Sequence, residues 1–241
     1  MIVYGHRGAK GEAPENTIAG ARHAVERGVR HLEIDLRLSR DGKLIVLHDD
    51  SLKRTAGVRG KAGSYTAKEL AALDARADGP PWPNKRQTGV PTLDAMVSAL
   101  PEISHWQLEL KGGSRRYKER LARAVVDWLS DSSLDCVVTS SETDLLGAIK
   151  QEMPQQATGY ISRLPDPREV LTSCACDYLI AHWSTAINPL LVASVQRKGI
   201  HISTWTVNDA TVIRNLHLLK IDSVITDFPS MALPLVAALE R

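Results

Sequence analysis

Short segments with the residue pattern of β-strands recur along the whole chain, and helical patterns separate most of them. The strand-like segments are IVYG, HLEIDL, WQLELK, CVVTS, TGYI, YLIAH, HISTW and SVIT. Predicted helices lie at residues 16–27, 115–129, 190–197, 211–219 and 231–239, with a further helix starting at Thr92. Eight strands that alternate with helices over 241 residues predict an α/β fold, a (β/α)8 TIM barrel. A doubly wound open sheet is the alternative architecture.

Length and composition narrow the class of protein further. Barrels of this length commonly form one domain, so we expect a single domain over residues 1–241. A net charge of +2 with 24% charged residues does not favour a nucleic-acid partner. The start MIVYGHRG does not resemble a secretory signal, no segment resembles a membrane span, and three cysteines are too few for a disulfide framework. These features predict a cytoplasmic protein; they do not address its oligomeric state.

The segment HLEIDLRLSRDGKLIVLHDD predicts a β-hairpin that extends the second strand. Asp41-Gly42 lies between two alternating apolar runs, which is a strong signal for a two-residue type I′ turn. That turn would place Asp35 opposite His48 and Glu33 opposite Asp50. Residues 51–91 are rich in glycine and proline and predict an insertion with little regular structure except a short helix near 66–73. We expect this insertion to cover part of a site.

Polar side chains occupy one face of the second and third strand-like segments. Glu33 and Asp35 alternate with apolar residues, and Gln107, Glu109 and Lys111 do the same. In a barrel the apolar faces pack on helices, so these polar faces must point inward. Converging carboxylates need positive charge nearby. We therefore favour a divalent cation, Ca²⁺ or Mg²⁺, held by Glu33, Asp35 and Glu109 over a salt-bridge network with Lys111 alone.

The first strand is followed directly by His6-Arg7-Gly8. A single histidine in such a position is most often a packed or solvated residue. Here His6 is expected at the same barrel end as His48, beside an arginine suited to bidentate contact with phosphate. Two imidazoles, a bound cation, Arg7 and Lys111 would suit the cleavage of a phosphodiester, with one histidine accepting a proton and the other donating one.

These residues resemble those of the glycerophosphodiester phosphodiesterase family. The matching segments are HRG (6–8), PENT (14–17), LEIDLRLSRDGKLIVLHD (32–49), LKRTAGVRG (52–60), PTLDA (91–95), LELK (108–111), WTVND (205–209) and ITDFP (225–229). Their order along nearly the whole chain makes the resemblance specific. It implies a barrel, a cation bound by Glu33, Asp35 and Glu109, acid and base roles for His6 and His48, and substrate contacts from Arg7, Lys111 and Trp205.

The resemblance also implies the reaction: hydrolysis of small glycerophosphodiesters to sn-glycerol 3-phosphate and an alcohol. Asn16 is expected to cap a helix and, with Glu15, to brace the loop that carries His6 and Arg7. Ser140-Ser141 and Ala19-Gly20 stand where many relatives have an aromatic residue, so the preferred head group is left open. Attack by water and attack by the glycerol's own hydroxyl both fit the residues.

Two other functions fit the same motifs. A phospholipase D acting on lysophospholipids would need an apolar rim beside the barrel mouth, for instance an exposed apolar patch in residues 51–91. A non-catalytic barrel that binds phosphate esters would not need both histidines and all three acids.

Overall fold

The computed structural model describes all 241 residues and shows a closed barrel of parallel strands. The barrel strands are β1 (Ile2–His6), β2 (His31–Leu38), β4 (His105–Leu110), β5 (Cys136–Ser140), β6 (Thr158–Ser162), β7 (Tyr178–His182), β8 (His201–Trp205) and β9 (Ser223–Thr226). Neighbouring strands pair in parallel around the ring, and β1 pairs with both β9 and β2, which closes it. The (β/α)8 barrel predicted from the alternation is thus confirmed, and the open sheet is excluded.

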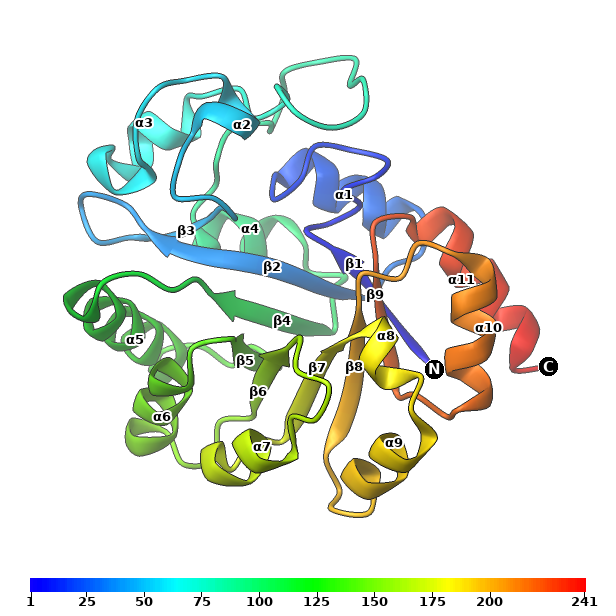
Figure 1. Cartoon of the computed structure of the whole chain (residues 1–241). Helices are drawn as coiled ribbons and strands as arrows, with labels where there is room; N and C mark the ends of the chain where they lie inside the picture. Colours follow the sequence, from blue (N-terminus) through cyan, green and yellow to red (C-terminus); the bar gives the residue numbers. More distant parts are fainter.

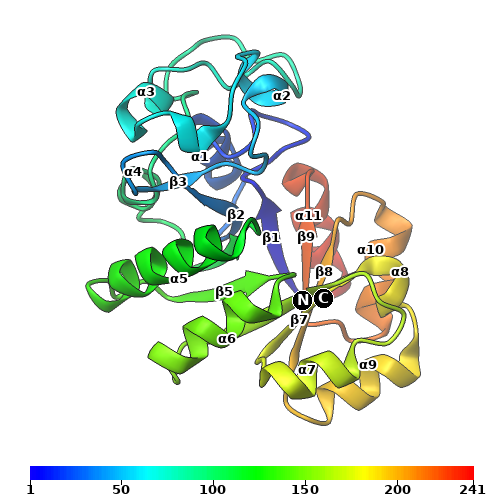
Figure 2. The same ribbon diagram turned by 60° about the vertical axis from the view of Figure 1, so that its left-hand side comes forward.

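Helices surround this barrel on its outer side (Figures 1 and 2). They are α1 (Ile18–Glu26), α4 (Leu93–Ala99), α5 (Arg115–Ser130), α6 (Thr143–Glu152), α7 (Arg168–Cys174), α8 (Trp183–Ala186), α9 (Pro189–Gln196), α10 (Ala210–Leu218) and α11 (Pro229–Leu239). The six predicted helices are present. The sequence patterns did not predict α6, α7 or the four-residue α8. The helix α7 buries only Leu171, which is too weak an apolar stripe to detect.

The first helix begins one residue later than its expected cap. Thr17 is the N-cap of α1, and its hydroxyl accepts a hydrogen bond from the Gly20 N–H at 3.0 Å. Asn16 has a positive φ of 54°, and its amide donates instead to Asp35 Oδ2 at 2.7 Å. The prediction that Asn16 caps this helix was therefore wrong, because its side chain donates to the Asp35 carboxylate inside the barrel.

Two apolar layers between strands and helices form the core. Leu32, Ile34, Leu36 and Leu38 of β2 are buried in the cluster that contains Leu121 and Val125 of α5. A second cluster packs β6 to β9 against α9, α10 and α11. Burial of each such side chain contributes about 1.5–3 kcal/mol. Because the apolar faces of β2 and β4 pack against helices outside the barrel, their polar faces point into it.

The antiparallel strand β3 (Leu44–Val46) extends β2 beyond the barrel, but with a register one residue away from the predicted one. Leu36 pairs with Val46 and Leu38 with Leu44, and the Leu47 N–H donates to the Asp35 carbonyl at 2.9 Å. Leu47, and not His48, therefore lies opposite Asp35. The predicted pairings of Asp35 with His48 and of Glu33 with Asp50 were wrong.

The turn explains this shift. A type I′ turn needs positive φ at both central residues, but only Gly42 has one, 76°. The Gly42 N–H donates to the Ser39 carbonyl at 3.1 Å, and Ser39 pairs with Lys43, which leaves a three-residue loop. Asp41 is held by the insertion, because its carboxylate accepts the Ala67 N–H at 2.9 Å. The tertiary contact therefore competes with the local turn preference.

The segment after the hairpin stands at one end of the barrel, at the top of Figure 1. It contains α2 (Lys53–Ala56), the 3₁₀ turn η1 (Ala62–Ser64) and α3 (Ala67–Ala71), where a short helix was predicted. Its apolar residues form a separate small core against the outward face of β3. That core fixes the segment over the C-terminal end of β2.

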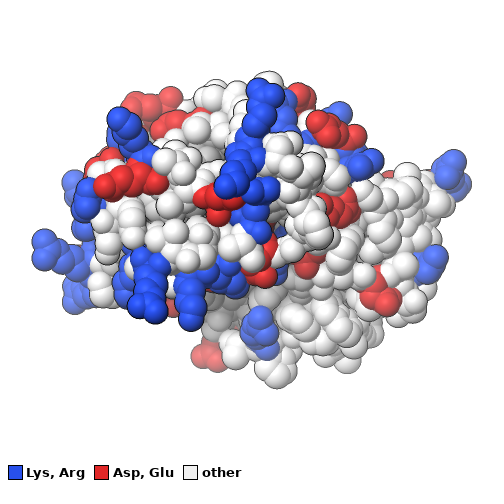
Figure 3. Space-filling view, turned by 90° about the horizontal axis from the view of Figure 1, so that it is seen from above, with Lys and Arg blue, Asp and Glu red and all other residues white.

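The two chain ends lie together on the opposite side, where the Met1 amino group contacts the Glu240 carboxylate. None of the helices combines the length and the apolar character that crossing a membrane requires. The face seen from the side of the insertion carries Lys and Arg next to Asp and Glu over much of its area (Figure 3).

Candidate active site

A cavity of about 280 Å³ opens at the C-terminal ends of the barrel strands. This is the end of a TIM barrel at which active sites lie. Of the eight predicted site residues, Asp35 is fully buried beneath the cavity and the other seven line it. The residues that sequence reasoning selected are therefore brought together in one place.

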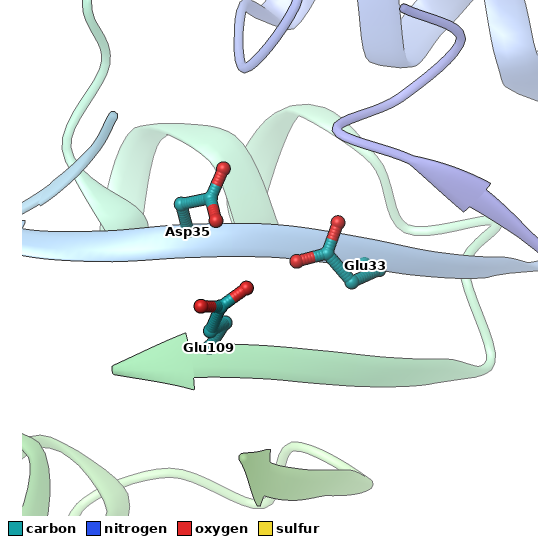
Figure 4. A group of neighbouring side chains, drawn as sticks. All are labelled: Glu33, Asp35 and Glu109. Carbon is teal, nitrogen blue, oxygen red and sulfur yellow. The ribbon is translucent and has the colours of Figure 1, made fainter. Parts of the chain in front are cut away.

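Three carboxylates meet at the floor of this cavity. Glu33 and Asp35 come from β2 and Glu109 from β4, where Asp35 and Glu109 are direct partners in the register. In Figure 4 the carboxyl groups of Glu33 and Asp35 lie over β2, and that of Glu109 lies near them between β2 and β4. One oxygen from each lies within 4.8 Å of the others. Oxygen ligands about 2.3–2.6 Å from one Ca²⁺ ion can be at most about 5 Å apart, so the spacing fits a shared cation.

Two basic side chains are directed at the central carboxylate of this group. Arg7 Nε lies 3.2 Å from Asp35 Oδ2, and Lys111 Nζ lies 2.8 Å from Asp35 Oδ1 and 2.5 Å from Glu109 Oε1. Burial alone would raise the pKa of Asp35, but Lys111 and Arg7 outweigh it and hold that pKa far below its usual range. Asp35 is therefore ionised, and it fixes both cations in the site.

Glu33 and Glu109, unlike Asp35, have raised pKa values. Burial, followed by the negative charges of Asp35 and Glu109, raises the pKa of Glu33 well above its usual value. Burial raises the pKa of Glu109 to about 6, against the opposing effect of Lys111. Glu33 Oε1 is buried without a hydrogen-bond partner. Buried acceptors normally have a partner, so this oxygen and the spacing of the three acids both fit a divalent cation.

His6 is held by a carboxylate that sequence reasoning did not select. Its Nδ1 lies 2.5 Å from Asp227 Oδ1 in the loop after β9, and Asn208 Nδ2 donates to Asp227 Oδ2 at 2.7 Å. Burial lowers the pKa of His6, and the bond to Asp227 opposes that effect. With Nδ1 donating to Asp227, Nε2 is a free acceptor; it lies 3.8 Å from Glu33 Oε2. The segment ITDFP, noted only as a family motif, carries this residue.

His48 reaches the cavity from the loop that follows β3. Because the chain leaves the ladder after Leu47, the strand register does not decide where this side chain points. His48 Nδ1 lies 2.7 Å from Asp49 Oδ1, and the His48 carbonyl accepts a bond from Arg37 Nε at 2.9 Å. Burial lowers the pKa of His48 as well. Both imidazoles are thus oriented through Nδ1 by a carboxylate, which leaves the other nitrogen for proton transfer.

Arg54 of α2 connects the two histidine-bearing loops. Its guanidinium donates to Asp49 Oδ2 at 2.6 Å and to both oxygens of Glu15 at 2.7 and 2.8 Å. Glu15 in turn accepts from Arg7 NH1 at 3.1 Å, and the Asn16 N–H donates to the Arg7 carbonyl at 2.9 Å. Glu15 and Asn16 therefore support the loop that carries Arg7, as expected. The role of Arg54 was not anticipated, although LKRTAGVRG was among the matched motifs.

Trp205 forms the opposite wall of the cavity, together with Ile161, Ile180 and Ile225. Its indole N–H donates to the Ile180 carbonyl at 3.2 Å. The guanidinium carbon of Arg163 lies 4.6 Å from the centre of its ring. The cavity therefore has a charged side at β2 and β4 and an apolar side at β6 to β9.

Comparison with known protein families gives one match that spans almost the entire chain. The model of the glycerophosphoryl diester phosphodiesterase family matches residues 6–231. Over 238 residues the chain is 29% identical to the protein YhdW of Bacillus subtilis (strain 168), a match that covers 95% of each chain. A glycerophosphodiester phosphodiesterase of Caldanaerobacter subterraneus is 27% identical over 242 residues, which covers 98% of this chain and 97% of the relative.

Solved structures give the same result. An Oleispira antarctica phosphodiesterase in complex with the product sn-glycerol-3-phosphate superposes with a TM-score of 0.88 at 28% identity, covering 98% of this chain and 97% of that one. The glycerophosphodiester phosphodiesterase of Thermotoga maritima superposes with a TM-score of 0.78 at 26% identity, covering 98% of each chain.

Proposed function

This chain belongs to the glycerophosphoryl diester phosphodiesterase family and is a glycerophosphodiester phosphodiesterase, and we propose that His6 and His48 carry the proton transfers of its reaction. The reaction is the hydrolysis of a glycerophosphodiester to sn-glycerol 3-phosphate and an alcohol. The observation that carries the proposal is the pairing of each imidazole with its own carboxylate, Asp227 or Asp49, at the edge of one acidic pocket. Each pairing holds a ring nitrogen ready to exchange a proton with substrate.

Glu33, Asp35 and Glu109 would hold one divalent cation, Ca²⁺ or Mg²⁺. Two buried carboxylates and one half-buried one share this site, and Glu33 Oε1 has neither a hydrogen bond nor an ion pair, which fits such an ion. When bound, the ion supplies positive charge that polarises a phosphate oxygen. The presence of Lys111 and Arg7 beside Asp35 does not replace it, because both are already paired with carboxylates.

Arg7 and Lys111 would bind the phosphate, and Trp205 would contact the glycerol. Arg7 and Lys111 are fixed by Asp35, so they lose little side-chain freedom when substrate binds. As charge accumulates on the phosphate, both cations stabilise it without moving. The apolar wall around Trp205 excludes water from the other side of the cavity.

The two histidines would have different tasks because they are buried to different extents. The His6 side chain is 10% exposed and that of His48 is 33% exposed. The alcohol must leave through the open side of the cavity, so His48 is placed to donate a proton to it. His6, on the inner side, would accept the proton of the attacking hydroxyl, whether that belongs to water or to the glycerol.

A metal-replete assay of glycerophosphoethanolamine tests this function, with the phosphorus products identified by NMR. His6→Ala and His48→Ala should each lower kcat by about 10²–10⁴-fold, and EDTA should abolish activity in a way that added Ca²⁺ or Mg²⁺ restores. His217 lies at the other end of the barrel, near Met1 and Ile2, so His217→Ala is the control. Full activity in either site variant, or full activity with EDTA, would contradict the assignment.

A lysophospholipid is the second candidate substrate. Residues 51–91 hold none of the exposed large apolar side chains, but Leu164 and Ile187, in the loops after β6 and β7, are 43% and 47% exposed. Such an edge would suit an acyl chain. Lysophosphatidylcholine in the same assay decides between the two: faster turnover than every small diester would favour the lipid substrate.

We also propose that residues 1–241 act as one domain and that the insertion over residues 51–91 serves the same site. The contacts of Arg54 with Glu15 and Asp49 support this. The three free cysteines are consistent with our expectation of a cytoplasmic location.

A further inference from the structure

Arg163 lines the active-site cavity on the side away from the acidic group. It directly follows β6, and its side chain is exposed. Its guanidinium lies over the ring of Trp205, with 4.6 Å between the guanidinium carbon and the ring centre. Unlike Arg7 and Arg54, which also lie at this end of the barrel, it forms no ion pair with an aspartate or glutamate.

The other two cations of the cavity differ from Arg163 in this respect. Arg7 is paired with Asp35 and Glu15, and Lys111 with Asp35 and Glu109. Their charges are largely balanced by carboxylates of the protein. Of the three cations that line the cavity, Arg163 is therefore the one whose positive charge is not balanced by a paired carboxylate. That field extends to His182, whose pKa is lowered by burial and then by the charge of Arg163.

The position of Arg163 also determines what the indole can bind. The face of a tryptophan is the preferred protein surface for a quaternary ammonium group, through a cation–π interaction. Here a protein cation already occupies one face of Trp205, while the edge of the indole is tied to the Ile180 carbonyl. A cationic head group at the open side of the cavity would thus meet a like charge, and it would find this face of the indole already covered.

We propose that Arg163 sets the substrate class by disfavouring glycerophosphodiesters whose alcohol is cationic, such as choline or ethanolamine, relative to those whose alcohol is neutral or anionic. The inference rests on the proposed function, because it concerns the alcohol that leaves from the same cavity. With the phosphate at β2 and β4 and the glycerol beside Trp205, the alcohol would extend to the open side of the cavity, which the exposed Arg163 lines.

A pair of substrates of equal shape isolates the charge. Glycerophosphocholine and its 3,3-dimethylbutyl ester analogue differ only in the quaternary nitrogen, which is a neutral carbon in the analogue. The wild-type enzyme should hydrolyse the neutral analogue with a kcat/KM roughly three- to tenfold above that of the choline ester at low salt, the effect of one partly screened charge at close range.

Variants of Arg163 should change this ratio in a predictable order. Arg163→Lys should keep the ratio above one, Arg163→Gln should bring it to about one, and Arg163→Glu should favour the choline ester. Arg197→Gln, an exposed arginine at the end of α9, makes the same change in net charge and should leave the ratio as in the wild type.

The outcomes separate this inference from the proposed function. A ratio that is the same in the wild type, Arg163→Gln and Arg163→Glu overturns the inference, including the case in which kcat/KM falls equally for both esters because Arg163 contacts the glycerol. If the wild-type enzyme hydrolyses no glycerophosphodiester at all, the proposed function is overturned and the inference with it.

Discussion

At the residue scale, each histidine of the site has a carboxylate partner that fixes its orientation. His6 is held by Asp227 and His48 by Asp49, from loops that follow different strands. The two pairs differ in exposure, and from this difference we propose that the inner imidazole serves the attacking hydroxyl and the outer one the leaving alcohol.

Replacement of His48 by alanine should therefore slow substrates according to their leaving group. An ethanolamine or glycerol alkoxide needs a proton, so kcat should fall by about 10²–10⁴-fold. A p-nitrophenyl ester of glycerol phosphate releases a stable anion and should lose less than about tenfold. His6→Ala should slow both substrates alike. Steady-state kinetics with the two esters measure this, and an equal loss for both in His48→Ala would contradict the assignment.

At the scale of elements, the insertion and the loops of the barrel are joined by few but specific contacts. Arg54 of α2 bonds to Asp49 beside His48 and to Glu15, which supports Arg7. At another place Glu12, in the loop after β1, accepts bonds from Ser230 at the start of α11 and from His23 of α1. These contacts hold the loops in place relative to the strands.

Loss of the Arg54 guanidinium should disturb the chemical step more than binding. Arg54→Met leaves Asp49 and Glu15 without their shared partner, and removal of such supporting bonds typically costs about 10–100-fold in activity. We expect that loss mostly in kcat, and a smaller loss for Arg54→Lys. Arg59→Met, at an exposed position of the same insertion, is the control. An unchanged kcat in Arg54→Met would show that the insertion does not orient His48.

The Glu12 contact should make stability depend on pH. Burial would raise the pKa of Glu12, but the bonds from Ser230 and His23 lower it. A carboxylate with a lowered folded pKa stabilises the protein above its unfolded pKa of about 4.3 and loses that contribution as the pH falls through the folded value. The Tm difference between wild type and Glu12→Gln should therefore be larger at pH 7 than at pH 4. Glu26 is exposed at the end of α1, and Glu26→Gln should show no such trend. If the Tm of Glu12→Gln differs from that of the wild type equally at pH 7 and pH 4, this prediction is contradicted.

At the scale of the whole molecule, the barrel and the position of its acids could be read from the sequence. The period of two in β2 and β4 separates polar from apolar faces, and a closed barrel leaves only its interior for Glu33, Asp35 and Glu109. The hairpin register could not be read in this way, because the Asp41 carboxylate is bonded to Ala67, which is distant in the sequence. For the same reason Asp227 and Arg54 were missed: their partners are set by tertiary structure and follow no local spacing.

The proposed mechanism as a whole depends on one ion shared by the three carboxylates. Isothermal titration calorimetry of the metal-free protein with Ca²⁺ and with Mg²⁺ tests this directly, using wild type, Glu33→Gln and Glu109→Gln, with Glu26→Gln as the control. We predict one site per chain for at least one of the two ions, with affinity reduced by at least about tenfold in both site variants and unchanged in the control. Absence of binding in the wild type, or equal affinity in all four proteins, would contradict the account.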